Sequence, residues 1–167
     1  MSILTAKQMQ SLFKRYYRVI NYIDKINMGK SSNQKIKQIQ IPSTLTQSIA
    51  YYYILNNPSI IGLSQIDQIL LEQGNNKTHD FIYKGNSTIN IEIKSTGFTN
   101  DYQRFRPNAL KAHYALWLNF SFKSNNYDLA VFNPKNLKPV KNGEVNINWD
   151  NLLKNHNQIK LIYGLKP

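Results

Sequence analysis

The sequence contains no cysteine, so its 167 residues cannot form a disulfide framework, a thiolate zinc site or a cysteine nucleophile. No apolar run approaches the roughly 20 residues that a helix needs to span a bilayer. The start of the chain also lacks the order of basic and then apolar residues that is typical of a secretory signal. These absences predict a soluble, cytoplasmic protein with no membrane partner.

Acidic residues are scarce: 9 Asp and Glu stand against 21 Lys and Arg, which gives a formal net charge of +12. A field of this sign attracts phosphate backbones, so nucleic acid is the leading candidate for a partner. The 41% of hydrophobic residues and 12% of aromatic residues argue against disorder. A chain of this length suits one domain with its own core.

The charge is uneven along the chain, which divides the single domain into three parts. Residues 1–40 hold eight Lys and Arg against one acid and form a basic, helical N-terminal arm. Residues 43–137 form the core that carries the chemistry, and residues 138–167 form a C-terminal extension. In the extension we expect a turn at Asn142-Gly143, a short helix capped by Asn148 and a last strand.

The arm is predicted to be one long helix, because its apolar residues recur at helical spacing between an N-cap at Thr5 and a stop at Gly29. Lys14 and Arg18 belong to a basic stripe along one side of this helix. We expect both residues to contact DNA, and a solvated face opposite a core face is the alternative interpretation.

The stretch HDFIYKGNSTINIEIKST, residues 79–96, sets acidic residues into two strand-like runs. The glycine and asparagine between the runs predict an antiparallel hairpin. Side chains alternate along a strand, so Glu92 and Lys94 share one face about 7 Å apart, and three isoleucines occupy the other. Pairing across the hairpin brings Asp80 near Glu92.

These three residues supply the minimum set for phosphodiester hydrolysis. Two carboxylates can hold Mg²⁺, which prefers oxygen ligands and keeps several waters. A neighbouring lysine can orient or deprotonate the attacking water and offset negative charge in the transition state. An ordinary surface hairpin with a Glu/Lys pair is the alternative.

The stretch resembles the PD-(D/E)xK nuclease motif, with Asp80 matching the first acid and Glu92-x-Lys94 the second half. That superfamily includes many restriction endonucleases and Holliday-junction resolvases. The resemblance implies that the two acids bind Mg²⁺, with Mn²⁺ as a substitute, and that the lysine assists the attacking water. It covers residues 43–137, because residues 97–120 and 127–137 resemble the helix and two closing strands of the family's core.

The chain departs from the family pattern in two places. Members often carry a further acid on the helix before the motif, where this sequence has Gln47. Either Gln47 fills that place as a neutral oxygen donor and auxiliary catalytic residue, or Asp67 or Glu72 supplies the carboxylate, or the match there is spurious. His79 replaces the proline of the motif. All three histidines are interpreted as structural or surface groups.

Further cations follow the motif. Arg104, Arg106 and Lys111 bracket Pro107, which suits the first turn of a helix expected over residues 107–115. These cations are predicted to contact DNA, and the arginines could clamp phosphates or read guanine edges. After them, residues 114–122 and 128–134 are expected to be strands.

We therefore expect an α/β domain with a restriction-endonuclease-like core, in which a central mixed β-sheet is flanked by helices. The expected activity is Mg²⁺-dependent hydrolysis of double-stranded DNA, which the resemblance places closest to a small type II restriction endonuclease acting as a homodimer. The alternatives are a structure-selective nuclease, such as a junction resolvase or a homing endonuclease, a non-catalytic basic nucleic-acid-binding protein, or a basic component of a ribonucleoprotein.

Overall fold

The computed structural model of the chain describes residues 3–31, 33–35, 41–66, 70–71, 79–97, 102–121, 126–139, 141–155 and 159–166. Short 3₁₀ helices are labelled η. The elements in chain order are α1 (Ala6–Asn27), α2 (Ser43–Asn56), η1 (Pro58–Ile61), β1 (Leu70–Leu71), β2 (Phe81–Lys84), β3 (Thr88–Gly97), β4 (Tyr102–Phe105), η2 (Ala109–Lys111), β5 (Tyr114–Ser121), β6 (Asn126–Phe132), η3 (Pro134–Asn136), η4 (Lys141–Gly143), β7 (Val145–Asn148), α3 (Trp149–Asn155) and β8 (Lys160–Leu165).

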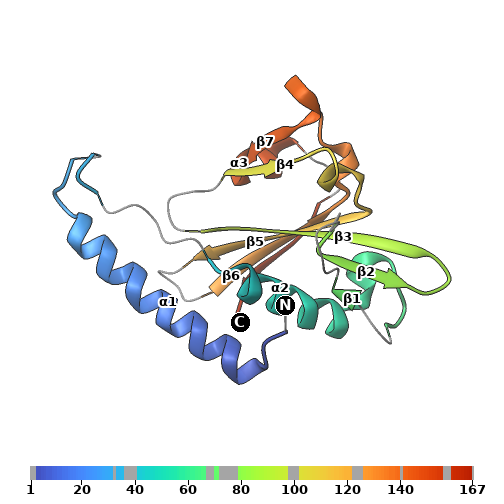
Figure 1. The fold of residues 1–167 in the computed structure, drawn as a ribbon, viewed down its shortest axis with the longest axis horizontal. Helices are drawn as coiled ribbons and strands as arrows, with labels where there is room; N and C mark the ends of the chain where they lie inside the picture. The colour runs from blue at the N-terminus through green and yellow to red at the C-terminus, as the bar shows by residue number, and fades with distance from the viewer. Residues whose placement is uncertain are drawn as a thin grey trace.

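A mixed sheet of six strands, in the order β1-β2-β3-β5-β6-β8, forms the centre of the molecule. Strands β3 and β5 are parallel, and the other neighbouring pairs are antiparallel. Helices α1 and α2 lie on one side of this sheet, and a second sheet of β4 and β7 lies with α3 on the other (Figure 1). The expected α/β class and the mixed central sheet flanked by helices are confirmed.

The N-terminal helix was predicted closely, because its ends carry strong local signals. The Thr5 hydroxyl accepts a hydrogen bond from the Gln8 backbone N–H, and the Gln8 side chain accepts one from the Thr5 N–H, which completes a capping box. Past the helix end, Gly29 has a φ of 77°. The apolar face of α1 packs on the sheet, where the rings of Phe13 and Phe120 lie 5.6 Å apart.

Two apolar cores cover the two faces of the sheet. On the helical side, the alternating isoleucines of β3 pack with α1 and α2. On the other side, Phe105 of β4, Trp117 of β5 and Trp149 of α3 lie together, with the two tryptophan rings 5.4 Å apart and nearly perpendicular. Among the described residues, no helix combines the length and apolarity needed to cross a membrane.

The structure corrects several local predictions. The helix expected over residues 107–115 is wrong, because only η2 forms there and Tyr114 already pairs with Ile91 at the start of β5. Ser43 is the first residue of α2 rather than its cap, and Pro42 precedes the helix without a side-chain cap. Strands β4 and β7 were not predicted.

Candidate active site

The β2–β3 hairpin places the first acid opposite the second. Phe81 pairs with Ile91, and the Asp80 N–H donates a hydrogen bond to the Ile91 carbonyl at 3.1 Å. Asp80 therefore occupies the next position beyond the last regular pair, across from Glu92. The antiparallel hairpin that the sequence predicted is confirmed.

The period-two pattern of β3 is also confirmed. Ile91 and Ile93 lie in the core under the helices, whereas Glu92 and Lys94 are on the opposite face. The Lys94 ammonium donates a hydrogen bond to Glu92 Oε1 at 2.6 Å. Both side chains are largely buried, with exposed fractions of 19% for Lys94 and 11% for Glu92, so this pair is shielded from solvent.

Asp80 is held by two donors that come from different elements. Gln47 Nε2 on α2 donates to Asp80 Oδ1 at 2.6 Å, and the Ile93 N–H on β3 donates to Asp80 Oδ2 at 2.7 Å. Asp80 and Gln47 are both buried, so these bonds form where water screens little. The carboxylate is thus fixed between a helix and the strand that carries Glu92 and Lys94.

Gln47 is therefore next to Asp80, as expected for the further ligand that we predicted on the helix before the motif. Its Oε1 is buried and accepts no hydrogen bond within the described part of the chain. The orientation of a carboxamide is assigned from its hydrogen bonds, because oxygen and nitrogen are nearly equivalent in shape. The side chain offers both a donor to Asp80 and an oxygen with unused acceptor capacity.

The donor set fits a hard divalent cation. The described residues contain no group of three or more His, Cys, Asp and Glu side chains arranged to hold a metal. Mg²⁺ needs only one or two carboxylates, because it keeps several waters. Asp80 and Glu92, with the Gln47 carboxamide, can supply these oxygen ligands. Asp67 and Glu72, the other candidates for a third ligand, lie outside the described residues.

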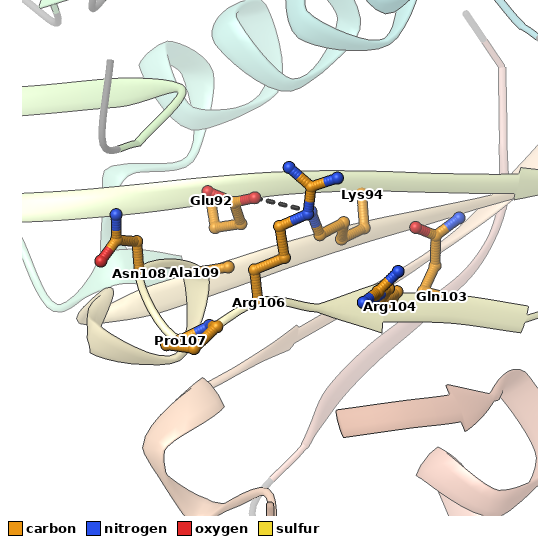
Figure 2. A pocket seen from close by; sticks show the side chains of 8 residues that line it. All are labelled: Glu92, Lys94, Gln103, Arg104, Arg106, Pro107, Asn108 and Ala109. Carbon is orange, nitrogen blue, oxygen red and sulfur yellow. Dashed lines mark hydrogen bonds and ion pairs between the residues drawn. The ribbon is translucent and has the colours of Figure 1, made fainter. Parts of the chain in front are cut away.

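A cavity of about 620 Å³ opens beside the Glu92–Lys94 pair. Figure 2 shows both side chains projecting from β3 toward β4 and the turn that follows it. The cavity is lined by Glu92, Lys94, Gln103, Arg104, Arg106, Pro107, Asn108 and Ala109. Three of these side chains are cationic and one is anionic, which suits a phosphate group.

Strand β4 forms one wall of the cavity, and side-chain hydrogen bonds connect it to its neighbours. Gln103 Nε2 donates to the Ser95 carbonyl of β3 at 2.7 Å, and Arg104 Nε donates to Glu144 at 2.7 Å. By contrast, the side chain of exposed Arg106 has no hydrogen bond or ion pair with any described residue. Arg106 is therefore available to a ligand in the cavity, whereas Arg104 is already paired.

Lys94 is also in contact with the second core. Its ammonium lies 5.5 Å from the centre of the Phe105 ring, which is fully buried on β4. A cation over an aromatic face is attracted to it, so Phe105 helps to orient Lys94. This contact could not be predicted from the sequence, because β4 is only four residues long and was not itself predicted.

The predicted DNA contacts divide between two sides of the molecule. Arg104 and Arg106 line the cavity, and Lys111 is exposed at the end of η2. Lys14 and Arg18 are exposed on α1, which covers the other side of the sheet (Figure 1). The structure therefore does not bring the two predicted sets together.

His79 and His113 are the two histidines among the described residues, and neither projects into the cavity beside Glu92. His113 Nδ1 accepts a hydrogen bond from the Asn90 N–H at 3.0 Å. Burial, with smaller contributions from the charges of Lys135 and His79, lowers the pKa of His113. His79 is buried directly before Asp80. His156 lies outside the described residues.

No protein-family model matches the chain, and a search of curated proteins gives no match. The resemblance to PD-(D/E)xK nucleases therefore depends on the motif residues and on the geometry described above.

Proposed function

We propose that the protein is a Mg²⁺-dependent endodeoxyribonuclease with a restriction-endonuclease-like core, acting on double-stranded DNA as a homodimeric type II restriction enzyme does. The observation that carries the proposal is the Glu92–Lys94 pair on β3, which lines a cavity that Arg106 also lines, with Asp80 held across the hairpin from Glu92 by Gln47 and by the Ile93 N–H. The resemblance implies products with a 5′-phosphate and a 3′-hydroxyl.

In this proposal, Asp80, Glu92 and Gln47 hold Mg²⁺ or Mn²⁺. A bound cation of this kind polarises the phosphate and makes water more acidic. Lys94 is paired with Glu92, so we assign it as a hydrogen-bond donor that orients the attacking water and offsets charge on the phosphate. Phe105 keeps the Lys94 ammonium in place.

The positive lining of the cavity supports binding of the DNA backbone. Arg106 is exposed and has no partner among the described residues, so it can pair with a phosphate through two parallel hydrogen bonds. Arg104 faces the same cavity but is paired with Glu144, so we assign it a secondary role. Lys111, the last residue of η2, is exposed and adds a further positive charge.

The test is incubation of the purified protein with plasmid and phage DNA, with Mg²⁺ or with EDTA. We expect discrete fragments that require Mg²⁺ and disappear in Glu92→Ala and Lys94→Ala. The matched control is Lys154→Ala, at an exposed lysine in the last turn of α3, which should cleave as the unmodified protein does. Intact DNA in every sample, with salt-sensitive binding only, would overturn the proposal.

The same preparation should be offered a four-way junction and a flapped duplex. Cleavage of these branched substrates, with little digestion of linear duplex, would replace the restriction-enzyme assignment by a structure-selective nuclease. Retained Mg²⁺ dependence and loss of cleavage in Glu92→Ala would still support the proposed site.

A further inference from the structure

The outward face of α1 carries a continuous positive surface. Its exposed cations are Lys7, Lys14, Arg15, Arg18 and Lys25, and none of them has an ion pair with a described residue. Asp24 is the one acid of the helix, and its side chain is partly buried rather than on this exposed surface. We call these five cations the α1 stripe.

The helix geometry aligns the stripe opposite the buried face. Lys7, Lys14, Arg18 and Lys25 are seven, four and seven residues apart, spacings that return to one side of an α-helix. At 1.5 Å per residue, these four cations extend over about 27 Å. That length is most of one turn of B-DNA, which is about 34 Å.

One further feature favours nucleic acid over bulk solvent as the partner. Tyr22 is 66% exposed and lies between Arg18 and Lys25 along the helix. An aromatic side chain among cations can contact sugars and bases while the cations bind phosphates. A second copy of this chain would bring a like-charged stripe against this one, which is unfavourable.

The α1 stripe and the cavity are on opposite sides of the central sheet (Figure 1). The outer face of α1 lies roughly one helix diameter, about 10–12 Å, beyond the sheet on one side. The cavity that holds Glu92 and Lys94 opens on the other side. A straight duplex bound along one side of the sheet does not reach the other.

From these observations we infer that the α1 stripe binds a second segment of duplex DNA while the first occupies the cavity. The inference rests on the proposed function for the identity of the polyanion, but it does not require cleavage. Each chain then has two DNA sites, one that reacts and one that only binds through the backbone. Because the cations of the stripe bind the phosphate backbone, we expect binding at the second site to be sensitive to salt and indifferent to sequence.

The test is a bridging assay in EDTA, so that no cleavage intervenes. A biotinylated duplex on beads captures the protein, and capture of a second, fluorescent duplex of unrelated sequence is measured. The variants are Lys14→Glu/Arg18→Glu for the stripe, Arg106→Glu for the cavity, and Lys84→Glu/Lys154→Glu as an exposed control with the same change in charge as the stripe variant.

We expect the unmodified protein and the control to capture the second duplex. In the stripe variant and in the cavity variant, the amount of second duplex captured should decrease at least about tenfold. Each of these two variants should still bind a single duplex. In capture experiments over a salt series, two lost phosphate contacts lower the log–log slope by about 2. Circular dichroism checks that each variant is folded.

Three results would overturn the inference. The first is that the unmodified protein captures no second duplex. The second is that the stripe variant bridges as well as the control, which would mean that a dimer bridges through its two cavities. Alternatively, the stripe variant loses binding of single and second duplexes equally, which would mean one continuous DNA surface. Bridging without any Mg²⁺-dependent cleavage would keep this inference while removing the proposed nuclease activity.

Discussion

Replacing Gln47 tests the geometry of the candidate metal site without relying on catalysis. Gln47→Leu removes the 2.6 Å hydrogen bond to Asp80 but keeps a side chain of similar size. A hydrogen bond to a charged group contributes about 1.5–3 kcal/mol. In a chain of this length each kcal/mol shifts the melting temperature by about 2–4 °C, so we expect a decrease of about 3–12 °C.

Gln47→Glu should be more harmful in the absence of a cation. It brings a second carboxylate to hydrogen-bonding distance of Asp80 at a position where both side chains are buried. An uncompensated buried charge costs about 3–5 kcal/mol, which corresponds to about 6–20 °C at pH 8 in EDTA. Lowering the pH allows one carboxyl group to take a proton and relieves the repulsion.

Millimolar Mg²⁺ should restore most of the melting temperature of Gln47→Glu, because the added carboxylate becomes a ligand, and should do little for Gln47→Leu. Differential scanning fluorimetry in EDTA and in Mg²⁺, at pH 5 and pH 8, measures all four conditions. Equal melting temperatures for the two variants in EDTA, with no response to Mg²⁺, would refute the assigned contact and the role of Gln47 in a cation site.

Three further predictions concern stability. Burial and the charge of Lys135 lower the pKa of His113 from 6.5, so His113 binds its proton more weakly in the folded protein. We therefore expect the free energy of unfolding, measured by denaturation between pH 8 and pH 5, to decrease as the pH falls below about 6.5. His113→Asn should flatten this profile. Trp117→Phe removes the buried indole hydrogen bond to Thr96 at 2.7 Å and should cost about 1–3 kcal/mol by urea denaturation. Gly62→Ala forces a φ of 76° on a residue with a Cβ and should cost about 1–2 kcal/mol in the same assay, whereas an unchanged midpoint would contradict the assigned turn.

Residues close together in the sequence were sufficient to predict the helices and strands whose apolar residues form one regular face. The antiparallel hairpin followed from its turn residues and from the alternation of β3, and the strand at Tyr114–Ser121 followed from its apolar run. The short C-terminal helix was also predicted, and Asn148 does cap it by accepting a hydrogen bond from the Asn151 N–H at 2.7 Å. In each case the residues that define the element are neighbours in the sequence.

The turn after β4 shows where such signals fail. Residues 107–115 have the composition of a helix, but Ala109 is buried in the second core, Ala112 is also buried, and Tyr114 joins β3 in parallel pairing. Tertiary contacts therefore override helix propensity. Strand β4 was missed for a related reason, because its partner β7 lies at least 40 residues further along the chain, where Phe105 pairs with Val145. The cavity wall depends on this long-range pairing, so the sequence could indicate Glu92 and Lys94 but not the surface that faces them.

Gln47 departs from the pattern of the nuclease motif that the chain resembles, and its contacts give a physical reason for a carboxamide at this position. A buried Asp80 needs donors when no cation is bound, and a glutamate at position 47 would supply none. The carboxamide donates to Asp80 through Nε2 and keeps Oε1 free of hydrogen bonds within the described residues. Rotation of the amide by half a turn exchanges these two atoms, so one side chain can stabilise the carboxylate before a cation binds and supply an oxygen afterwards. In the proposed cation site this arrangement leaves one negative charge fewer than three carboxylates would supply, so we expect weaker retention of Mg²⁺ than in a site with three carboxylates.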